Sequence, residues 1–350
     1  PGPGKVPLVM VHGWMDVAAS YQFVVDALQQ DHYIIAPDWR GYGQSTCVGA
    51  VDNYWFPDYL ADLDALLCCD DLGLDGKTPV DLLGHSMGGN IVMNYAGVQP
   101  ARIRRLVNLE GFGLPRAEAS EAPSRMARWL NHLRHPRPLR AFADVKGVKA
   151  RLQENNPRLP DERALWLAHQ WAEPRDDGQW HILADEAHKN INPLVYRVEE
   201  VLALYSQISA PVLAVEATDN SLDQWWQGKY TLTEYHERLK AVPQLQRAVV
   251  TDAGHMLHHD QPEALALAPE IRNIVSLVIG EMLPEIKGTS ARELVILVLA
   301  AALVGIKILL LLPAWLFGVF AYRLQNKIII SQWMAIIVWV ISSLVLLTLF

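Results

Sequence analysis

Ser86 lies at the centre of a Gly-x-Ser-x-Gly pattern that runs from Gly84 to Gly88. An apolar run at 79–83 precedes this pattern, and apolar residues at helical spacing follow it at 90–98. We therefore expect a sharp strand-to-helix turn, which exposes the serine Oγ while the glycines let the backbone pass closely. The amides at the start of the helix favour developing negative charge. The pattern predicts a nucleophilic serine that attacks a carbonyl carbon.

A serine hydroxyl is a weak nucleophile, so a neighbouring base must take its proton. We expect His255 to be that base, because it follows the last predicted strand and sites in parallel sheets assemble at the carboxyl ends of strands. His258 and His259 lie close by, in a His-x-x-His-His arrangement. No carboxylates accompany them at metal-ligand spacing, so we expect no metal site there. We assign both residues to the surface or to contacts with a cap segment.

The base in turn needs a carboxylate, which holds the imidazole and stabilises the imidazolium. Asp219 follows a predicted strand and gives the chain order serine, aspartate, histidine that is typical of such sites. We therefore expect Asp219 to contact His255. Glu110, at the end of the preceding strand, is the main alternative, since that strand end faces the same site. Further candidates in the same region are Glu216 and Asp223.

Attack on a carbonyl also requires two amides that bind the oxyanion. We expect Met87, the residue after the serine, to provide one N–H. Trp14, in the loop His12-Gly13-Trp14, is expected to provide the other, with its side chain forming a wall of the acyl pocket. The residues expected to line the substrate pocket are His12, Trp14, His85, Trp129 and Trp166.

Strands and helices alternate along most of the chain, which predicts an α/β fold with a mainly parallel sheet and helices on both faces. Short segments rich in apolar residues predict strands at 6–11, 33–36, 79–83, 103–109, 211–215 and 247–251. Apolar residues at helical spacing predict helices at 20–30, 55–69, 90–98, 233–242 and 262–282.

The segment 111–209 lacks this alternation. It is rich in proline, arginine and tryptophan, and it contains amphipathic helical stretches at 124–133 and 161–171. We interpret it as a mostly helical cap, inserted into a core that is formed by residues 1–110 and 210–282.

Four motifs together resemble those of the α/β-hydrolase superfamily. They are Val11-His12-Gly13-Trp14, Asp38-x-Arg40-Gly41-x-Gly43-x-Ser45, Gly84-His85-Ser86-Met87-Gly88-Gly89 and Gly254-His255. The resemblance covers residues 6–282. It implies the α/β-hydrolase fold, a serine-histidine-acid triad and a lid over the site formed by 111–209. The motifs are similar to those of serine carboxylesterases and cofactor-free perhydrolases, whereas the similar haloalkane dehalogenases and epoxide hydrolases use aspartate as the nucleophile.

The chain has 350 residues, of which 51% are hydrophobic and 19% charged, so disorder is excluded for most of its length. Its net charge of −8 gives no basis for nucleic-acid binding. The charge is uneven, because residues 291–350 include four basic residues and one acidic residue, a net +3 that leaves −11 for the first 290. The cysteines, Cys47, Cys68 and Cys69, form no disulfide framework and are typical of a reducing compartment.

Two long apolar stretches, 294–322 and 328–350, follow a linker at 283–293. A helix needs about 20 apolar residues to cross the core of a bilayer, and each stretch is long enough. We therefore expect a C-terminal transmembrane hairpin of two spans, with the catalytic domain on the cytoplasmic side. A homo-oligomer formed through this hairpin is left open.

Together these patterns predict a serine hydrolase that cleaves esters or thioesters of apolar substrates through an acyl-enzyme and uses no cofactor or metal. The expected partners are a small apolar ester-type substrate and the lipid bilayer, and not a nucleic acid. Two alternatives stay open. The same residues could carry out perhydrolysis or acyl transfer, or the chain could be a membrane-tethered, non-catalytic scaffold with the hydrolase fold.

Overall fold

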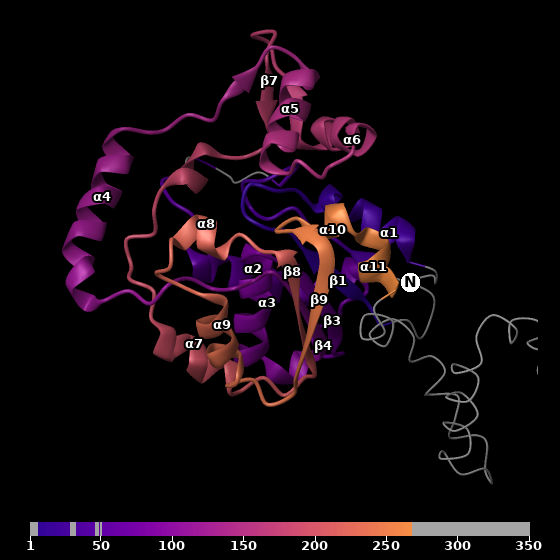
Figure 1. The fold of residues 1–350 in the computed structure, drawn as a ribbon, viewed down its shortest axis with the longest axis vertical. Helices are drawn as coiled ribbons and strands as arrows, with labels where there is room; N and C mark the ends of the chain where they lie inside the picture. The colour runs from indigo at the N-terminus through magenta and orange to yellow at the C-terminus, as the bar shows by residue number, and fades with distance from the viewer. Residues whose placement is uncertain (1–5, 29–32, 46–48, 50, 268–350) are drawn as a thin grey trace, which may run out of the picture. The chain divides into compact units, whose positions relative to one another are not determined.

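A six-stranded parallel sheet forms the centre of the protein (Figure 1). The computed structural model describes residues 6–28, 33–45, 49 and 51–267. The order of the strands in the sheet is β2-β1-β3-β4-β8-β9. Their bounds are Ile34–Ile35 for β2, Leu8–Val11 for β1, Val80–His85 for β3, Ile103–Leu109 for β4, Val212–Asp219 for β8 and Leu245–Gly254 for β9. These are the strands that the apolar runs predict, and the α/β-hydrolase fold expected from the motifs is confirmed.

Helices cover both faces of the sheet, as Figure 1 shows. One face carries α1 (Gln22–Ala27), α10 (Leu257–Asp260) and α11 (Pro262–Leu267), and the other carries α2 (Phe56–Leu67), α3 (Met87–Val98), α7 (Val198–Tyr205) and α9 (Leu232–Leu239). The remaining short elements of this part are α8 (Leu222–Trp226) and the 3-10 turns Ala18–Tyr21, Asp70–Leu72 and Pro100–Arg102.

Alternating side chains of the strands divide between the cores on the two faces. In β1, Val9 and Val11 pack into the core below α2 and α3, whereas Leu8 and Met10 pack into the core below α1, α10 and α11. All four are buried, which explains why the strand is an uninterrupted apolar run rather than an alternating one.

The cap lies between β4 and β8 in the sequence. It contains α4 (Ala122–Arg134), α5 (Val145–Asn155) and α6 (Asp161–Trp171), together with the 3-10 turns Ala119–Glu121 and Glu186–Lys189. Helices α4 and α6 lie where the sequence predicts them. The prediction missed a small antiparallel sheet, of order β5-β7-β6, whose strands are Ala141–Phe142, Trp180–Ile182 and Ala172–Pro174. Strands of two or three residues are too short to show a periodic pattern.

A third core holds α5, α6 and the small sheet together, and Figure 1 shows these elements grouped apart from α4. Phe142, Val148, Leu167 and Trp171 are among its buried members, and Val17 from the loop after β1 joins them. The cap is thus anchored to the segment that follows the first strand.

The predicted spans 294–322 and 328–350, the linker 283–293 and the end of the predicted helix 262–282 lie outside the described residues. Among the residues that are described, no helix combines the length and the apolar character that crossing a bilayer requires.

Candidate active site

Ser86 occupies the turn between β3 and α3 in a strained conformation. Its φ is +52° and its ψ is −113°, a region that side-chain-bearing residues rarely adopt. The Ser86 N–H donates to Leu109 O at 2.8 Å, which ties the turn to the neighbouring strand β4. Gly88 makes the turn possible, because a Cβ there would lie 2.2 Å from Val11 O. The turn predicted from the Gly-x-Ser-x-Gly pattern is therefore present.

His255, directly after β9, lies within hydrogen-bond distance of Ser86. Its Nε2 is 3.0 Å from Ser86 Oγ, and its Nδ1 is 3.2 Å from Glu110 Oε2. When Nδ1–H donates to the carboxylate, Nε2 keeps the lone pair that accepts the serine proton. Three residues from the ends of β3, β4 and β9 are thus joined in one chain of hydrogen bonds.

Glu110 is buried and held from several sides. Its Oε1 accepts from the Ala217 N–H at 2.7 Å, and its backbone N–H donates to Val215 O at 3.0 Å. Its φ of +55° turns the chain sharply after β4. Asn108 fixes this turn, because its Oδ1 accepts from Gly111 N–H at 2.9 Å and its Nδ2 donates to Gly111 O at 3.0 Å.

The expectation that Asp219 contacts His255 is not met, and the alternative, Glu110, occupies that position. Asp219 Oδ2 instead lies 2.6 Å from Arg158 Nη2, and the Asp219 side chain is 66% exposed. The physical reason is the length of β8, which continues to Asp219 and pairs it with Gly254 of β9 after an irregular step. The carboxylate consequently sits at the exposed end of the strand.

The two other carboxylates considered at this strand end have different surroundings. Glu216 is buried, and its Oε1 lies 2.7 Å from Nε2 of His236. Asp223 is exposed in the first turn of α8.

Burial sets the electrostatics of the pair formed by Glu110 and His255. It raises the pKa of Glu110 to about 8, with the Ala217 N–H acting against this shift and the charge of Glu216 adding to it. Burial lowers the pKa of His255 to about 4, against the pull of the Asp16 carboxylate. Burial therefore favours the neutral form of both the Glu110 carboxyl and the His255 imidazole.

The loop His12-Gly13-Trp14 packs directly against the serine turn. A Cβ at Gly13 would lie 3.2 Å from Ser86 Cβ, so only glycine brings the loop this close without displacing a neighbour. Met87 is the first residue of α3, where backbone N–H groups have no partner within the helix. The structure thus puts both residues expected to supply oxyanion amides, Trp14 and Met87, next to the turn.

The residues expected to line the pocket have more varied positions. His12 is fully buried, and its Nε2 accepts from the Trp39 N–H at 3.0 Å. The His12 side chain thus holds the loop His12-Gly13-Trp14 in place and does not line a pocket wall. His85 is buried as well, and its Nε2 lies 2.8 Å from the carbonyl oxygen of His255. Trp14 is 54% exposed, and its indole N–H donates to His188 O.

The two cap tryptophans contact other aromatic rings. Trp129 of α4 packs near Trp55, with ring centroids 6.2 Å apart, and Trp166 of α6 packs on Phe23 at 5.6 Å. Trp225 of α8, which was not among the predicted site residues, stands edge-on to His255 with ring centroids 4.4 Å apart. The Trp225-Trp226 pair shortly after a predicted strand end was the available signal.

His258 and His259 are buried rather than exposed. The assignment of these residues to the surface is wrong, because α10 turns both side chains inward. The contact with the cap holds for His259, whose carbonyl oxygen accepts from Arg163 of α6 at 3.2 Å.

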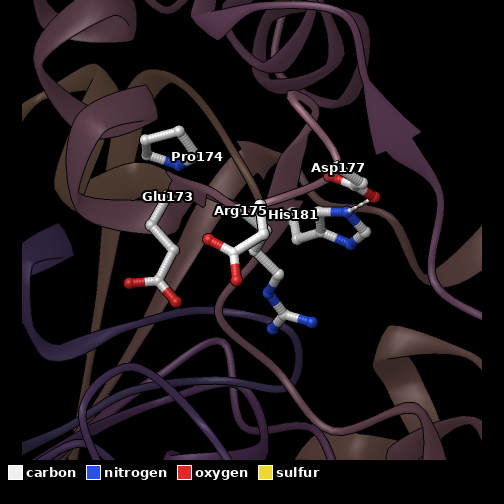
Figure 2. A pocket seen from close by; sticks show the side chains of 6 residues that line it. Glu173, Pro174, Arg175, Asp177 and His181 are labelled. Carbon is white, nitrogen blue, oxygen red and sulfur yellow. Dashed lines mark hydrogen bonds and ion pairs between the residues drawn. The ribbon is translucent and has the colours of Figure 1, made fainter.

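A shallow pocket elsewhere in the described part is formed by the turn between β6 and β7. Figure 2 shows its lining residues, with His181 Nε2 and Asp177 Oδ2 joined at 2.8 Å. No member of the Ser86, His255 and Glu110 group lines it.

Comparison with known proteins places this fold and site in a family. A family model described as alpha/beta hydrolase fold matches residues 6–262. The chain therefore belongs to the α/β-hydrolase family and is an enzyme of that class.

Individual relatives agree with this assignment. The chain is similar to a serine hydrolase-like protein of Danio rerio, with 26% identity over 276 residues that cover 76% of this chain and 80% of the relative. It is also similar to a 3-hydroxybutyrate-oligomer hydrolase of Cupriavidus necator, with 26% identity that covers 75% of this chain and 87% of the relative. A hypothetical protein of Pseudomonas aeruginosa has a solved structure with a TM-score of 0.66 and 26% identity, covering 79% of this chain and 92% of that chain.

The electrostatics of the site predict how the reactivity of Ser86 depends on pH. Proton removal from Ser86 requires neutral His255 and ionised Glu110. Because the pKa of Glu110 is raised to about 8, labelling of Ser86 by a fluorophosphonate should speed up as the pH rises from 6 through 8 and level off about one unit above this pKa. His255, with its pKa lowered to about 4, is neutral over this whole range.

Labelling rates measured by mass spectrometry between pH 6 and 9 check this expectation. Glu110→Gln should label more slowly and lose the rise with pH, and Ser86→Ala should not label. A rate in the parent protein that is constant or falls over this range would contradict the assignment of Glu110.

Proposed function

We propose that the enzyme is a serine hydrolase that cleaves carboxylic ester or thioester bonds of apolar substrates through an acyl-enzyme. The observation that carries this proposal is the chain of hydrogen bonds from Ser86 Oγ through His255 to Glu110. A strained turn presents the nucleophile, a base contacts it at 3.0 Å, and a buried carboxylate orients the base.

The reaction follows from these contacts. Ser86 Oγ attacks the carbonyl carbon while its proton passes to His255 Nε2, which gives a tetrahedral oxyanion. Collapse of this intermediate breaks the bond to the alkoxide or thiolate, which takes the proton from His255. A water molecule then gives a proton to His255 and attacks the acyl-enzyme, and the second collapse returns the proton to Ser86.

Glu110 acts on His255 and not on the substrate. A carboxylate at Nδ1 fixes the tautomer that leaves Nε2 free, and it stabilises the imidazolium that forms when the serine proton moves. The Ala217 N–H holds Glu110 Oε1, so the other oxygen is directed to His255. We assign the oxyanion to the backbone N–H groups of Met87 and Trp14, since both residues adjoin the serine turn.

The preference for apolar substrates is supported by one aromatic side chain against His255 and another in the loop that packs on the serine turn. Trp225 stands edge-on to the base and is 45% exposed, and Trp14 is 54% exposed. The relative from Cupriavidus necator, which acts on 3-hydroxybutyrate oligomers, supports acyl chemistry.

Hydrolysis of p-nitrophenyl esters with short to long acyl chains tests the proposed activity. We expect the parent protein to hydrolyse them and Ser86→Ala to lose roughly 10⁶-fold in kcat, as loss of a catalytic serine does in other triads. The acyl length with the highest kcat/KM reports the size of the pocket. Equal rates in the two proteins across the series would refute ester hydrolysis, and transfer of the acyl group to peroxide or an alcohol would then be measured.

A matched pair of variants tests which acid acts on His255. Glu110→Gln should lower kcat by about 10³–10⁴, because the ring loses the carboxylate that orients it. Asp219→Asn should keep kcat within roughly threefold, because Asp219 forms an exposed ion pair with Arg158. Comparable losses in both variants, or a larger loss in Asp219→Asn, would show that the acid is misassigned.

We also infer from the sequence that 294–322 and 328–350 form a membrane hairpin, which would bring the enzyme to apolar substrates in the bilayer. The full chain should then stay with membranes during extraction at alkaline pH, and detergent should release it. Protease protection in sealed vesicles would report the side on which the catalytic domain lies. Release by alkaline carbonate without detergent would contradict the hairpin.

A further inference from the structure

Asp16, His85 and His258 form a buried cluster directly behind the proposed catalytic residues. Each offers a ligand-type atom, and these atoms lie within 4.8 Å of one another. Asp16 is 3% exposed, His85 2% and His258 0%. The three come from the loop after β1, the end of β3 and the start of α10, so only the folded chain brings them together.

Several polar atoms of this cluster make no hydrogen bond among the described residues, although His258 Nε2 and Asp16 Oδ2 lie 3.8 Å apart as an ion pair. They are Asp16 Oδ2, His85 Nδ1 and both ring nitrogens of His258. Leaving a buried polar atom unpaired costs about 1–3 kcal/mol, so native structures almost always supply a partner. Here one such atom from each of the three residues lies within 4.8 Å of the others, an arrangement that a single bound ion could satisfy.

The other polar atoms of Asp16 and His85 are held firmly by hydrogen bonds. His85 Nε2 lies 2.8 Å from the carbonyl oxygen of His255, which places the ring proton on Nε2 and leaves a lone pair on Nδ1. Asp16 Oδ1 accepts from the hydroxyl of Ser20, from the Val17 N–H at 2.9 Å and from the Trp171 indole at 3.0 Å. Metal ligands are characteristically oriented in this way, with the non-ligating atom bonded to the surrounding protein.

We propose that Asp16 Oδ2, His85 Nδ1 and a ring nitrogen of His258 bind one transition-metal dication of the Zn²⁺ type. Two imidazoles and one carboxylate suit such ions, whereas Ca²⁺ and Mg²⁺ prefer sites made of oxygen atoms. Ligand atoms around a tetrahedral Zn²⁺ lie about 3.4 Å apart. His258 Nε2 and Asp16 Oδ2 are 3.8 Å apart, so this pair needs only a small shift to bind the ion.

Occupancy of this site bears on catalysis, an inference that rests on the proposed function. His85 precedes Ser86 and binds the carbonyl of His255, and the rings of His85 and His255 are 4.8 Å apart. A dication bound by His85 would place positive charge directly behind the ring that takes the serine proton, and this charge opposes the transfer of that proton. Metal binding should therefore inhibit ester hydrolysis, and a chelator should reverse the inhibition.

Equilibrium dialysis of the metal-free full chain against Zn²⁺, with the metal counted by plasma mass spectrometry, tests the site. We expect one buried Zn²⁺ per chain, and we expect Asp16→Asn and His258→Gln to lose it.

Control variants keep the cluster intact. His259→Gln removes a neighbouring buried histidine outside the cluster and should keep the ion. His181→Gln removes the exposed pair with Asp177 shown in Figure 2 and should also keep it. Trp171→Phe, which loses only the indole N–H to Asp16, should bind about 10–100-fold more weakly.

Three results would overturn the site. The first is no Zn²⁺ uptake by the parent chain at micromolar concentration. The second is uptake by folded Asp16→Asn and His258→Gln that equals uptake by the parent. The third is loss of uptake in His181→Gln alone.

If the ligand variants fail to fold, the visible spectrum of Co²⁺ bound to the parent protein tests the site instead. Strong absorption shows a four- or five-coordinate ion held by the protein, and the weak bands of six-coordinate Co²⁺ refute the site. Zn²⁺ uptake in Ser86→Ala separates this inference from the proposed activity, because binding does not require the serine.

Discussion

The chain of hydrogen bonds from Ser86 through His255 to Glu110 is the interaction on which the site depends, and the parallel sheet makes it possible. The three residues follow β3, β9 and β4, and parallel strands end at the same edge of a sheet. No short-range feature of the sequence could bring His255 within 3.2 Å of both Ser86 and Glu110. Strands β1 and β3 are buried along their whole length, and this burial helps to fix the sheet edge at which the three residues lie.

The residues at both ends of this chain of hydrogen bonds, Ser86 and Glu110, have backbone conformations that cost free energy. Ser86 and Glu110 have positive φ values, and such strain costs about 1–3 kcal/mol for each residue. Close packing maintains it, through the approach of Gly88 to Val11 and the clamp of Asn108 on Gly111. The strain turns the hydroxyl and the carboxylate toward His255 before any substrate binds, which is the preorganisation that acyl transfer requires.

Asp16 connects the cap to the region behind the nucleophile. Its carboxylate accepts from Trp171 at the end of α6 and lies beside His258, while His85 joins the same cluster from the position next to Ser86. The cap therefore contacts this buried cluster directly, through the Trp171 indole. The Trp171 indole thus holds in place a buried carboxylate whose charge raises the pKa of His255 against the larger effect of burial.

The sequence by itself determined the sheet, the serine turn and the position of His255, because each follows from a local pattern: runs rich in apolar residues, a Gly-x-Ser-x-Gly sequence and a histidine after the last strand. Only the tertiary structure decided between Glu110 and Asp219. Both follow strands at the same edge, and the choice depends on how far β8 continues and which carboxylate becomes buried. The inward position of His258 and its meeting with Asp16 were likewise beyond the sequence, since residues 242 positions apart approach only when α10 packs on the sheet.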